Sequence, residues 1–158
     1  MKIEIRHRVS NSVLFSHDAD TNSLKITIMV ALKAGVDLRG SDLRDSDLSY
    51  FNLSGIDLSG SNFSGSILSR SDFRFSNFRG SNFSGSDLSG SDFRYSDLSD
   101  SDFTSANLSY VDFNYTNLNS TSLRSALLDG KPPLFASNKE RTIVFSKYFN
   151  EENKEQAK

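Results

Sequence analysis

The chain has 158 residues, no cysteine and a formal net charge of −2, and only 36% of its residues are hydrophobic. The length suits one domain, and the lack of cysteine excludes disulfides, thiolate metal sites and cysteine nucleophiles. The small net charge gives no electrostatic basis for direct binding of nucleic acid or a membrane surface. The N-terminus lacks the apolar core of a signal peptide and no run reaches membrane-spanning length, so we expect a cytoplasmic protein.

Residues 1–35 do not repeat and are predicted to form a small α/β cap made of a hairpin and a short helix. Alternating "KIEIRHRV" and apolar "SVLFS" flank the turn-like "SNS", a pattern typical of a β-hairpin. Asn22 or Ser23 can cap a helix that stops at Gly35, although "KITIMV" also alternates as a strand would. The apolar residues at helical spacing are Leu24, Ile28 and Leu32.

Residues 36–128 repeat with a period of five. In steps of five from Leu38 to Leu128, all 19 central positions are Leu or Phe. The residue before the centre is Asp or Asn in 16 of the 19 units, and the residue before that is Ser, Ala or Thr in 15. Eight of the nine glycines fall two residues after a centre. A disordered segment has no reason to keep such phase, so this region is predicted to fold.

A period of five fits neither a single helix nor a single strand. Five steps advance an α-helix by about 500°, which scatters the centres around its axis. In a strand, an odd period places alternate centres on opposite faces. A chain that turns a corner once per unit can instead aim every centre at one interior. Glycine then suits corners with positive φ, and Asp or Asn can bond to the turn backbone. The sequence therefore predicts an all-β solenoid.

These units resemble those of the pentapeptide repeat family: a small residue, Asp or Asn, Leu or Phe, and two variable residues. The resemblance covers residues 36 to about 128 and implies a right-handed quadrilateral parallel β-helix of about five coils, with four units per coil. A coil spacing of about 4.8 Å makes the shaft roughly 23 Å long. The small position is mostly Ser where the family favours Ala, which places hydroxyls inside. Residues 1–35 also look like a leader that precedes the repeats in some phage and bacterial members.

Residues 129–158 break the repeat and are predicted to form a C-terminal cap or dimerisation segment with a mobile tail. "SNKE" at 137–140 fits a capping box, so a short helix is expected there. Both flanks can cover an open end of the solenoid, which would otherwise pair with another copy. One apolar cluster exceeds what a small cap needs and is the candidate dimerisation site: Ile143, Val144, Phe145, Tyr148 and Phe149.

Outward-facing residues must carry the function, because inward-facing ones build the rod. Residues 20 apart should stack, which gives one side an aromatic ladder with arginines and aspartates beside it. This pattern can merely stiffen the rod, or it can bind a protein, since Tyr and Arg are enriched at hot spots. The neighbouring side offers only Tyr50, Arg70 and Tyr110. The candidate partner-binding residues are Asp72, Arg74, Phe75, Asp92, Arg94, Tyr95, Asp97, Asp100, Asp102, Asp112 and Tyr115.

Residues 36–128 carry 12 acidic and 7 basic side chains. DNA of the same length would carry about 14 negative charges. Well-studied relatives protect or inhibit DNA gyrase with a DNA-like acidic rod. The resemblance therefore implies a non-enzymatic inhibitor or modulator that binds a basic or nucleic-acid-binding surface by partial DNA mimicry. The partner would be a type II topoisomerase, or a host defence protein if the gene is phage-borne. The alternative is a structural or self-associating scaffold with no nucleic-acid-related role.

No enzymatic chemistry, metal or cofactor is predicted. Ser and Asp are so abundant that Ser–Asp pairs carry no information. The only histidines, His7 and His17, would lie in different rungs of the hairpin, which disfavours a triad or a two-histidine metal site. The sequence contains no phosphate-binding loop and no HExxH motif.

Overall fold

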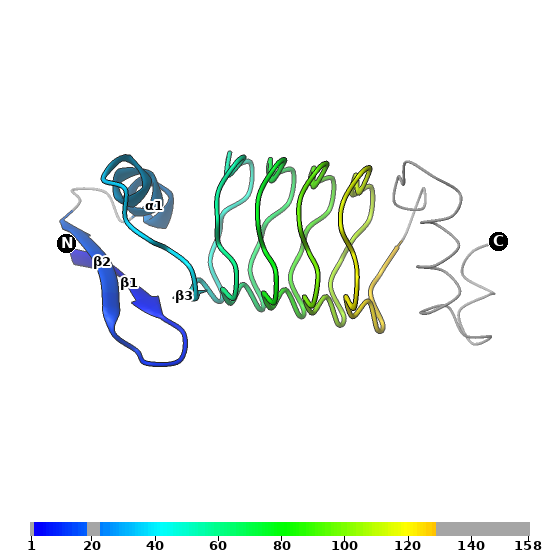
Figure 1. Ribbon diagram of the computed structural model, residues 1–158, viewed down its shortest axis with the longest axis horizontal. Helices are drawn as coiled ribbons and strands as arrows, with labels where there is room; N and C mark the ends of the chain where they lie inside the picture. The colour runs from blue at the N-terminus through cyan, green and yellow to red at the C-terminus, as the bar shows by residue number, and fades with distance from the viewer. Residues whose placement is uncertain (1, 19–22, 129–158) are drawn as a thin grey trace.

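The computed structural model describes residues 2–18 and 23–128, which form a small α/β unit followed by a stack of coils (Figure 1). Strand β1 (Lys2–His7) pairs antiparallel with β2 (Val13–Asp18), as the predicted hairpin requires. On its other edge β1 pairs with β3 (Ser41–Asp42), the start of the repeat region, so the sheet order is β2-β1-β3. This pairing joins the N-terminal unit to the first coil.

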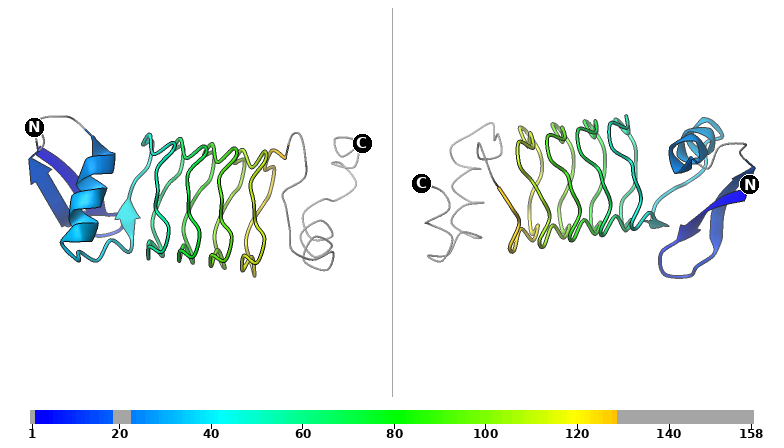
Figure 2. Two further views of the ribbon diagram at one scale, coloured as in Figure 1. Left: turned by 90° about the horizontal axis from the view of Figure 1, so that it is seen from above. Right: turned by 180° about the vertical axis from the view of Figure 1, so that it is seen from behind.

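Helix α1 (Leu24–Lys33) lies across the hairpin (Figure 2). Ser23 is its N-cap, and the Ser23 hydroxyl accepts a hydrogen bond from the Ile26 amide at 3.4 Å, so the helical interpretation of this segment is confirmed. The predicted apolar face was partly wrong. Leu32 is exposed, and the buried residues are Thr27, Ile28 and Ala31. No helix in residues 2–18 and 23–128 has the length and apolar character needed to cross a membrane.

The repeat region is a parallel solenoid in which each residue of a wall pairs with the residue 20 positions on, from Asp42↔Asn62 to Asn107↔Leu127. A turn every five residues and pairing between residues 20 apart divide each coil into four walls. Figure 2 shows these coils side by side along the rod. We name each wall after one outward residue. In chain order, the pairing columns are the Asp102 wall (42, 62, 82, 102, 122), the Asp87 wall (47, 67, 87, 107, 127), the Asp72 wall (52, 72, 92, 112) and the Asp97 wall (57, 77, 97, 117).

Asp and Asn shape the turn at the end of each wall. The Asp97 carboxylate accepts a hydrogen bond from the Ser99 amide at 2.9 Å, and the Asn77 side chain accepts one from the Arg79 amide at 3.1 Å. Every residue two positions after a centre, from 40 to 125, has a φ between 53° and 71°. The predicted corner once per five residues is thus confirmed. Eleven of these left-handed positions are not glycine, a point that matters for the outer surface.

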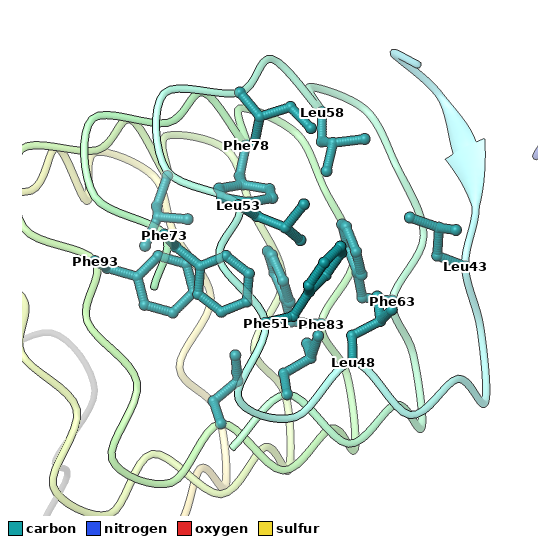
Figure 3. Packing of buried hydrophobic residues seen from close by; sticks show 14 of the residues in the cluster. Leu43, Leu48, Phe51, Leu53, Leu58, Phe63, Phe73, Phe78, Phe83 and Phe93 are labelled. Atoms are coloured by element: carbon teal, nitrogen blue, oxygen red, sulfur yellow. The ribbon is translucent and has the colours of Figure 1, made fainter. Parts of the chain in front are cut away.

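The Leu and Phe centres fill the interior, as predicted (Figure 3). Every centre from Leu38 to Phe113 is at most 3% exposed. Phe83 stacks between Phe63 and Phe103, with ring centroids 4.9 and 4.7 Å away. Phe78 meets the neighbouring rings edge to face. The core is therefore one continuous column of side chains that crosses every coil from 38 to 113.

The inward Ser hydroxyls bond successive coils together. The Ser101 hydroxyl donates to the Phe78 carbonyl at 2.8 Å, and the Ser96 hydroxyl donates to the Phe73 carbonyl at 2.6 Å. Both bonds join residues 23 positions apart, so they connect one coil to the next. Alanine cannot make this bond. The preference for Ser therefore adds a second set of inter-coil hydrogen bonds to the backbone ladders.

We expect Ser101→Ala to lower the free energy of unfolding by about 1 kcal/mol, the net contribution of a typical hydrogen bond. The Phe78 carbonyl keeps its bond from the Ser81 amide at 3.0 Å, so no buried acceptor is left unpaired. Chemical denaturation measures the change. The control is Ser84→Ala at a partly exposed turn position, where a change within about 0.5 kcal/mol is expected. Equal losses in both variants would contradict the role of the inward hydroxyls.

Candidate functional site

The structure assembles the predicted aromatic ladder at one corner of the rod. The rings of Phe75 and Tyr95 are 5.0 Å apart and those of Tyr95 and Tyr115 are 4.8 Å apart, each pair within 3° of parallel. Their exposed fractions are 64%, 51% and 61%. With Gly55 they form the Tyr95 corner, which lies between the Asp72 wall and the Asp97 wall.

The backbone of this corner is unfavourable for aromatic residues. Phe75, Tyr95 and Tyr115 have φ values of 60°, 63° and 62°, in the region that glycine occupies most easily. A bulky residue there costs of the order of 1 kcal/mol. The three residues form two stacked pairs, each worth roughly 0.5–1.5 kcal/mol, so stacking at most about balances this cost. Folding therefore gains little from these exposed rings, which favours a binding role.

The carboxylates of the Asp72 wall are neutralised by arginines. Arg74 Nη2 lies 2.6 Å from Asp72, and Arg74 Nε lies 3.7 Å from Asp92 in the next coil. Arg94 repeats the arrangement, 2.6 Å from Asp92 and 3.6 Å from Asp112. The hydrogen bond from Arg74 lowers the pKa of Asp72, and the bond with Asp92 raises the pKa of Arg94. Each arginine thus ties two coils together, and the wall is nearly neutral.

The ion pair of Asp72 predicts a specific dependence on pH. Because its folded pKa lies below the ordinary 3.8, its contribution is present at neutral pH and is lost as the pH falls through the folded pKa. We expect Asp72→Asn to remove under about 1 kcal/mol at pH 7, since the pair is partly exposed, and to make stability less dependent on pH below about 4. Urea unfolding from pH 7 to acid tests this. Asp102→Asn is the control, because Asp102 makes no ion pair within residues 2–18 and 23–128.

The structure separates the remaining predicted acidic residues. Asp97 lies on the Asp97 wall, beside the Tyr95 corner. Asp100 lies on the far corner of that wall and pairs with Arg79 at 3.1 Å. Asp102 is half a coil from Asp92, so these two carboxylates point from opposite walls. One flat partner surface cannot contact both. The sequence-based grouping of Asp102 with the aromatic ladder therefore does not form one surface.

Sequence reasoning gave too little weight to the opposite edge of the Asp72 wall. This edge, the Tyr110 corner, consists of Tyr50, Arg70, Gly90 and Tyr110. The Arg70 guanidinium lies 5.6 Å from the ring centroid of Tyr50 and donates a hydrogen bond to its hydroxyl at 3.1 Å. Tyr50 and Tyr110 are 70% and 64% exposed. Within the described residues, every exposed aromatic side chain thus lies on a corner that borders the Asp72 wall.

The two histidines lie apart, and the predicted dimerisation residues lie outside the described residues. His7 Nδ1 accepts a hydrogen bond from the Ser10 amide at 3.2 Å, whereas His17 lies on the neighbouring strand opposite Ile3. Residues 2–18 and 23–128 contain no cluster of three or more His, Asp or Glu side chains that could hold a metal ion. The predicted C-terminal helix and the dimerisation residues Ile143, Val144, Phe145, Tyr148 and Phe149 lie outside the described residues, and self-association stays a prediction.

Comparison with known proteins identifies similar sequences and folds. A family model of pentapeptide repeats matches residues 34–60, 56–94 and 86–130, with eight copies of its unit. Rfr23, a pentapeptide repeat protein from the cyanobacterium Cyanothece 51142, matches with 25% identity over 59% of this chain and a TM-score of 0.57. The match covers 63% of the length of Rfr23. No curated protein matches in sequence.

Two further solved structures are similar over parts of the chain. A pentapeptide repeat protein from Nostoc PCC 7120 has 26% identity over 72% of this chain and 85% of its own, with a TM-score of 0.40. One from the thylakoid lumen of Arabidopsis thaliana has 31% identity over 60% of this chain and 77% of its own, with a TM-score of 0.31. All three are pentapeptide repeat proteins.

Proposed function

Because this chain belongs to the pentapeptide repeat family, whose members form right-handed quadrilateral β-helices, we propose that it is a non-enzymatic rod that binds and modulates or inhibits a protein partner. The rod would have about five coils, covered at either end by residues 1–35 and 129–158. The partner would contact the Asp72 wall, the Tyr95 corner and the Asp97 wall. The observation that carries this proposal is the stack of three exposed aromatic rings on left-handed backbone.

The charges next to the ladder indicate what kind of partner fits. On the Asp97 wall, Asp57 and Asp97 make no ion pair within the described residues, in contrast to the neutralised Asp72 wall. A partner surface placed over the Tyr95 corner would therefore meet aromatic rings together with two carboxylates that are hydrogen-bonded to their turns but not paired with a cation. That combination suits a basic, nucleic-acid-binding surface of a protein, so DNA mimicry would be partial and confined to the Asp97 wall. A type II topoisomerase is the first partner to test, or a host defence protein if the gene is phage-borne.

The test compares charge removal on the Asp97 wall with charge removal on the Asp102 wall, which lies opposite the Asp72 wall, in a DNA gyrase binding and supercoiling assay. Asp57→Asn with Asp97→Asn removes two charges but keeps the turn hydrogen bond, as Asn77 and Asn117 do on the same wall. We expect this variant to bind several-fold more weakly, most clearly at low salt, because such charges act mainly on association. For the matched comparison, Asp97→Asn alone and Asp102→Asn each remove one charge, and the Asp102 carboxylate accepts a similar turn bond from the Thr104 amide at 2.9 Å.

Three outcomes would count against parts of this proposal. If Asp102→Asn weakens binding equally, the proposal that the partner contacts the Asp97 wall specifically is refuted. If the Asp57→Asn and Asp97→Asn variant binds as the wild type does, the proposal of electrostatic DNA mimicry is refuted. If the wild-type protein neither binds gyrase nor alters supercoiling, the topoisomerase is excluded, and partners captured from host lysate should be compared with the same variants.

A further inference from the structure

The Tyr110 corner contains a gap in its column of planar side chains. From one coil to the next the column reads Tyr50, Arg70, Gly90 and Tyr110, so the rung between Arg70 and Tyr110 has no side chain. The Arg70 guanidinium carbon lies over the Tyr50 ring, 5.6 Å from its centroid, and Nη1 donates to the Tyr50 hydroxyl, so the guanidinium is held between Tyr50 and the empty rung. Tyr110 is 64% exposed and bounds the gap from the following coil.

The size of this gap follows from the ladder on the other corner. Adjacent rings there are 5.0 and 4.8 Å apart, so one missing rung leaves room for one planar group in contact with a group on each side. Gly90 has a φ of +70°, similar to the values at Phe75 and Tyr95, so its backbone presents the same corner geometry. A Cβ built on Gly90 would meet only the Arg70 Cγ, at 3.4 Å. The floor of the gap is therefore open.

Glycine occupies seven of the 18 corner positions between residues 40 and 125, so Gly90 alone is no signal. The signal is its neighbours. Gly55 begins its column and has only Phe75 beside it, and the other glycine corners between residues 40 and 125 have glycine or a small or acidic residue on at least one side. Gly90, in contrast, has Arg70 on one side and Tyr110 on the other. Within these residues it is the one gap bounded by planar side chains on both sides.

We propose that the gap over Gly90 is a binding slot for one planar aromatic side chain of a protein partner, stacked between the Arg70 guanidinium and the Tyr110 ring. Guanidinium groups and phenol rings both stack on aromatic faces, and a buried aromatic anchor in a pocket is the usual centre of a binding hot spot. On the Tyr95 corner the equivalent position is filled by the ring of Tyr95 itself. At the slot, a partner's aromatic ring would take that position.

A protein side chain fits the slot better than a nucleobase. A base would bring its phosphates against a repeat region with 12 acidic and only 7 basic side chains. Asp87, on the wall that precedes the slot, makes no ion pair within the described residues and would repel a phosphate further. The protein nature of the occupant rests on the proposed function, whereas the slot itself depends only on the geometry of the Tyr110 corner.

The slot is tested with N-acetyltryptophanamide as the probe, titrated into the isotope-labelled full chain and followed by nuclear magnetic resonance. We expect saturable shifts of the amide signals of Ser89, Gly90 and Ser91. Gly90→Tyr fills the rung from within and should weaken probe binding at least tenfold. Gly85→Tyr is the matched control: it adds the same side chain at a corner with φ +65° and open space, and it should leave probe binding unchanged.

Removal of one side of the slot gives an independent variant. Tyr110→Ser should weaken probe binding as Gly90→Tyr does, whereas Tyr115→Ser on the Tyr95 corner should not. Absence of saturable shifts in the wild-type chain, or equal shifts in Gly90→Tyr, would overturn the slot. If the probe binds as expected but the partner assay is unaffected by Gly90→Tyr, the slot stands and its part in partner binding is refuted. If the probe fails while the Asp57→Asn and Asp97→Asn variant still weakens partner binding, only the slot is overturned.

Discussion

Phe83→Ala is expected to lower the free energy of unfolding by about 3–5 kcal/mol, the largest effect of any single truncation in the rod. Phe83 is fully buried at the middle of the core column. Its ring stacks on Phe63 and Phe103 and meets Phe78 edge to face at 5.5 Å. Alanine would leave a cavity between the rings of Phe63 and Phe103 in the two neighbouring coils. The neighbouring walls cannot collapse into it, because their spacing is set by the backbone ladder.

The matched control for this truncation is Phe83→Leu. Leu43 and Leu123 fill the same column two coils away on either side, so leucine is compatible with the backbone. We expect this change to cost less than about 1.5 kcal/mol, as nearly volume-conserving swaps do. Guanidinium denaturation followed by circular dichroism measures both variants. A loss below about 1 kcal/mol for Phe83→Ala would mean that the centres do not form a close-packed core.

The sequence predicted the interior of this protein more completely than its surface. A period of five leaves a single way to bury all the centres, so the walls, the corners and the inward Leu and Phe followed directly from spacing. The N-terminal helix was predicted from its cap and length. Its buried face was predicted only in part. Ile28 is buried as expected, whereas Leu32 is exposed, because the burial of Thr27 and Ala31 depends on how the hairpin meets the first coil.

The arrangement of charges on the surface could not be predicted from residue spacing, because it depends on the directions in which the side chains point. Arg74 reaches Asp92 in the next coil as well as Asp72, and this second contact neutralises a wall that looked acidic in sequence. The separation of Asp92 from Asp102 was available from counting, since ten residues are half a coil. The Tyr110 corner was harder to recognise, because Arg70 and Gly90 interrupt its aromatic column.

A substitution in the aromatic ladder is expected to affect partner binding much more than the stability of the fold. Tyr95→Gly is expected to weaken partner binding by at least about 2 kcal/mol, roughly 30-fold, as loss of a central hot-spot aromatic does. The same change should alter the free energy of unfolding by no more than about 1 kcal/mol, because glycine relieves the unfavourable φ of 63° while two stacking contacts are lost. Binding to the identified partner and chemical denaturation give the two measurements.

Tyr95→Ala is the control that isolates the backbone contribution. Alanine loses the same two ring contacts but keeps a Cβ at positive φ, so it should be less stable than Tyr95→Gly by about 1 kcal/mol and bind equally weakly. A ladder that exists only to stiffen the rod predicts a different pattern. Tyr95→Gly would then destabilise by several kcal/mol and binding would fall only in proportion to unfolded protein. That pattern would favour the scaffold interpretation, because the strain at this corner would be balanced entirely by contacts within the chain.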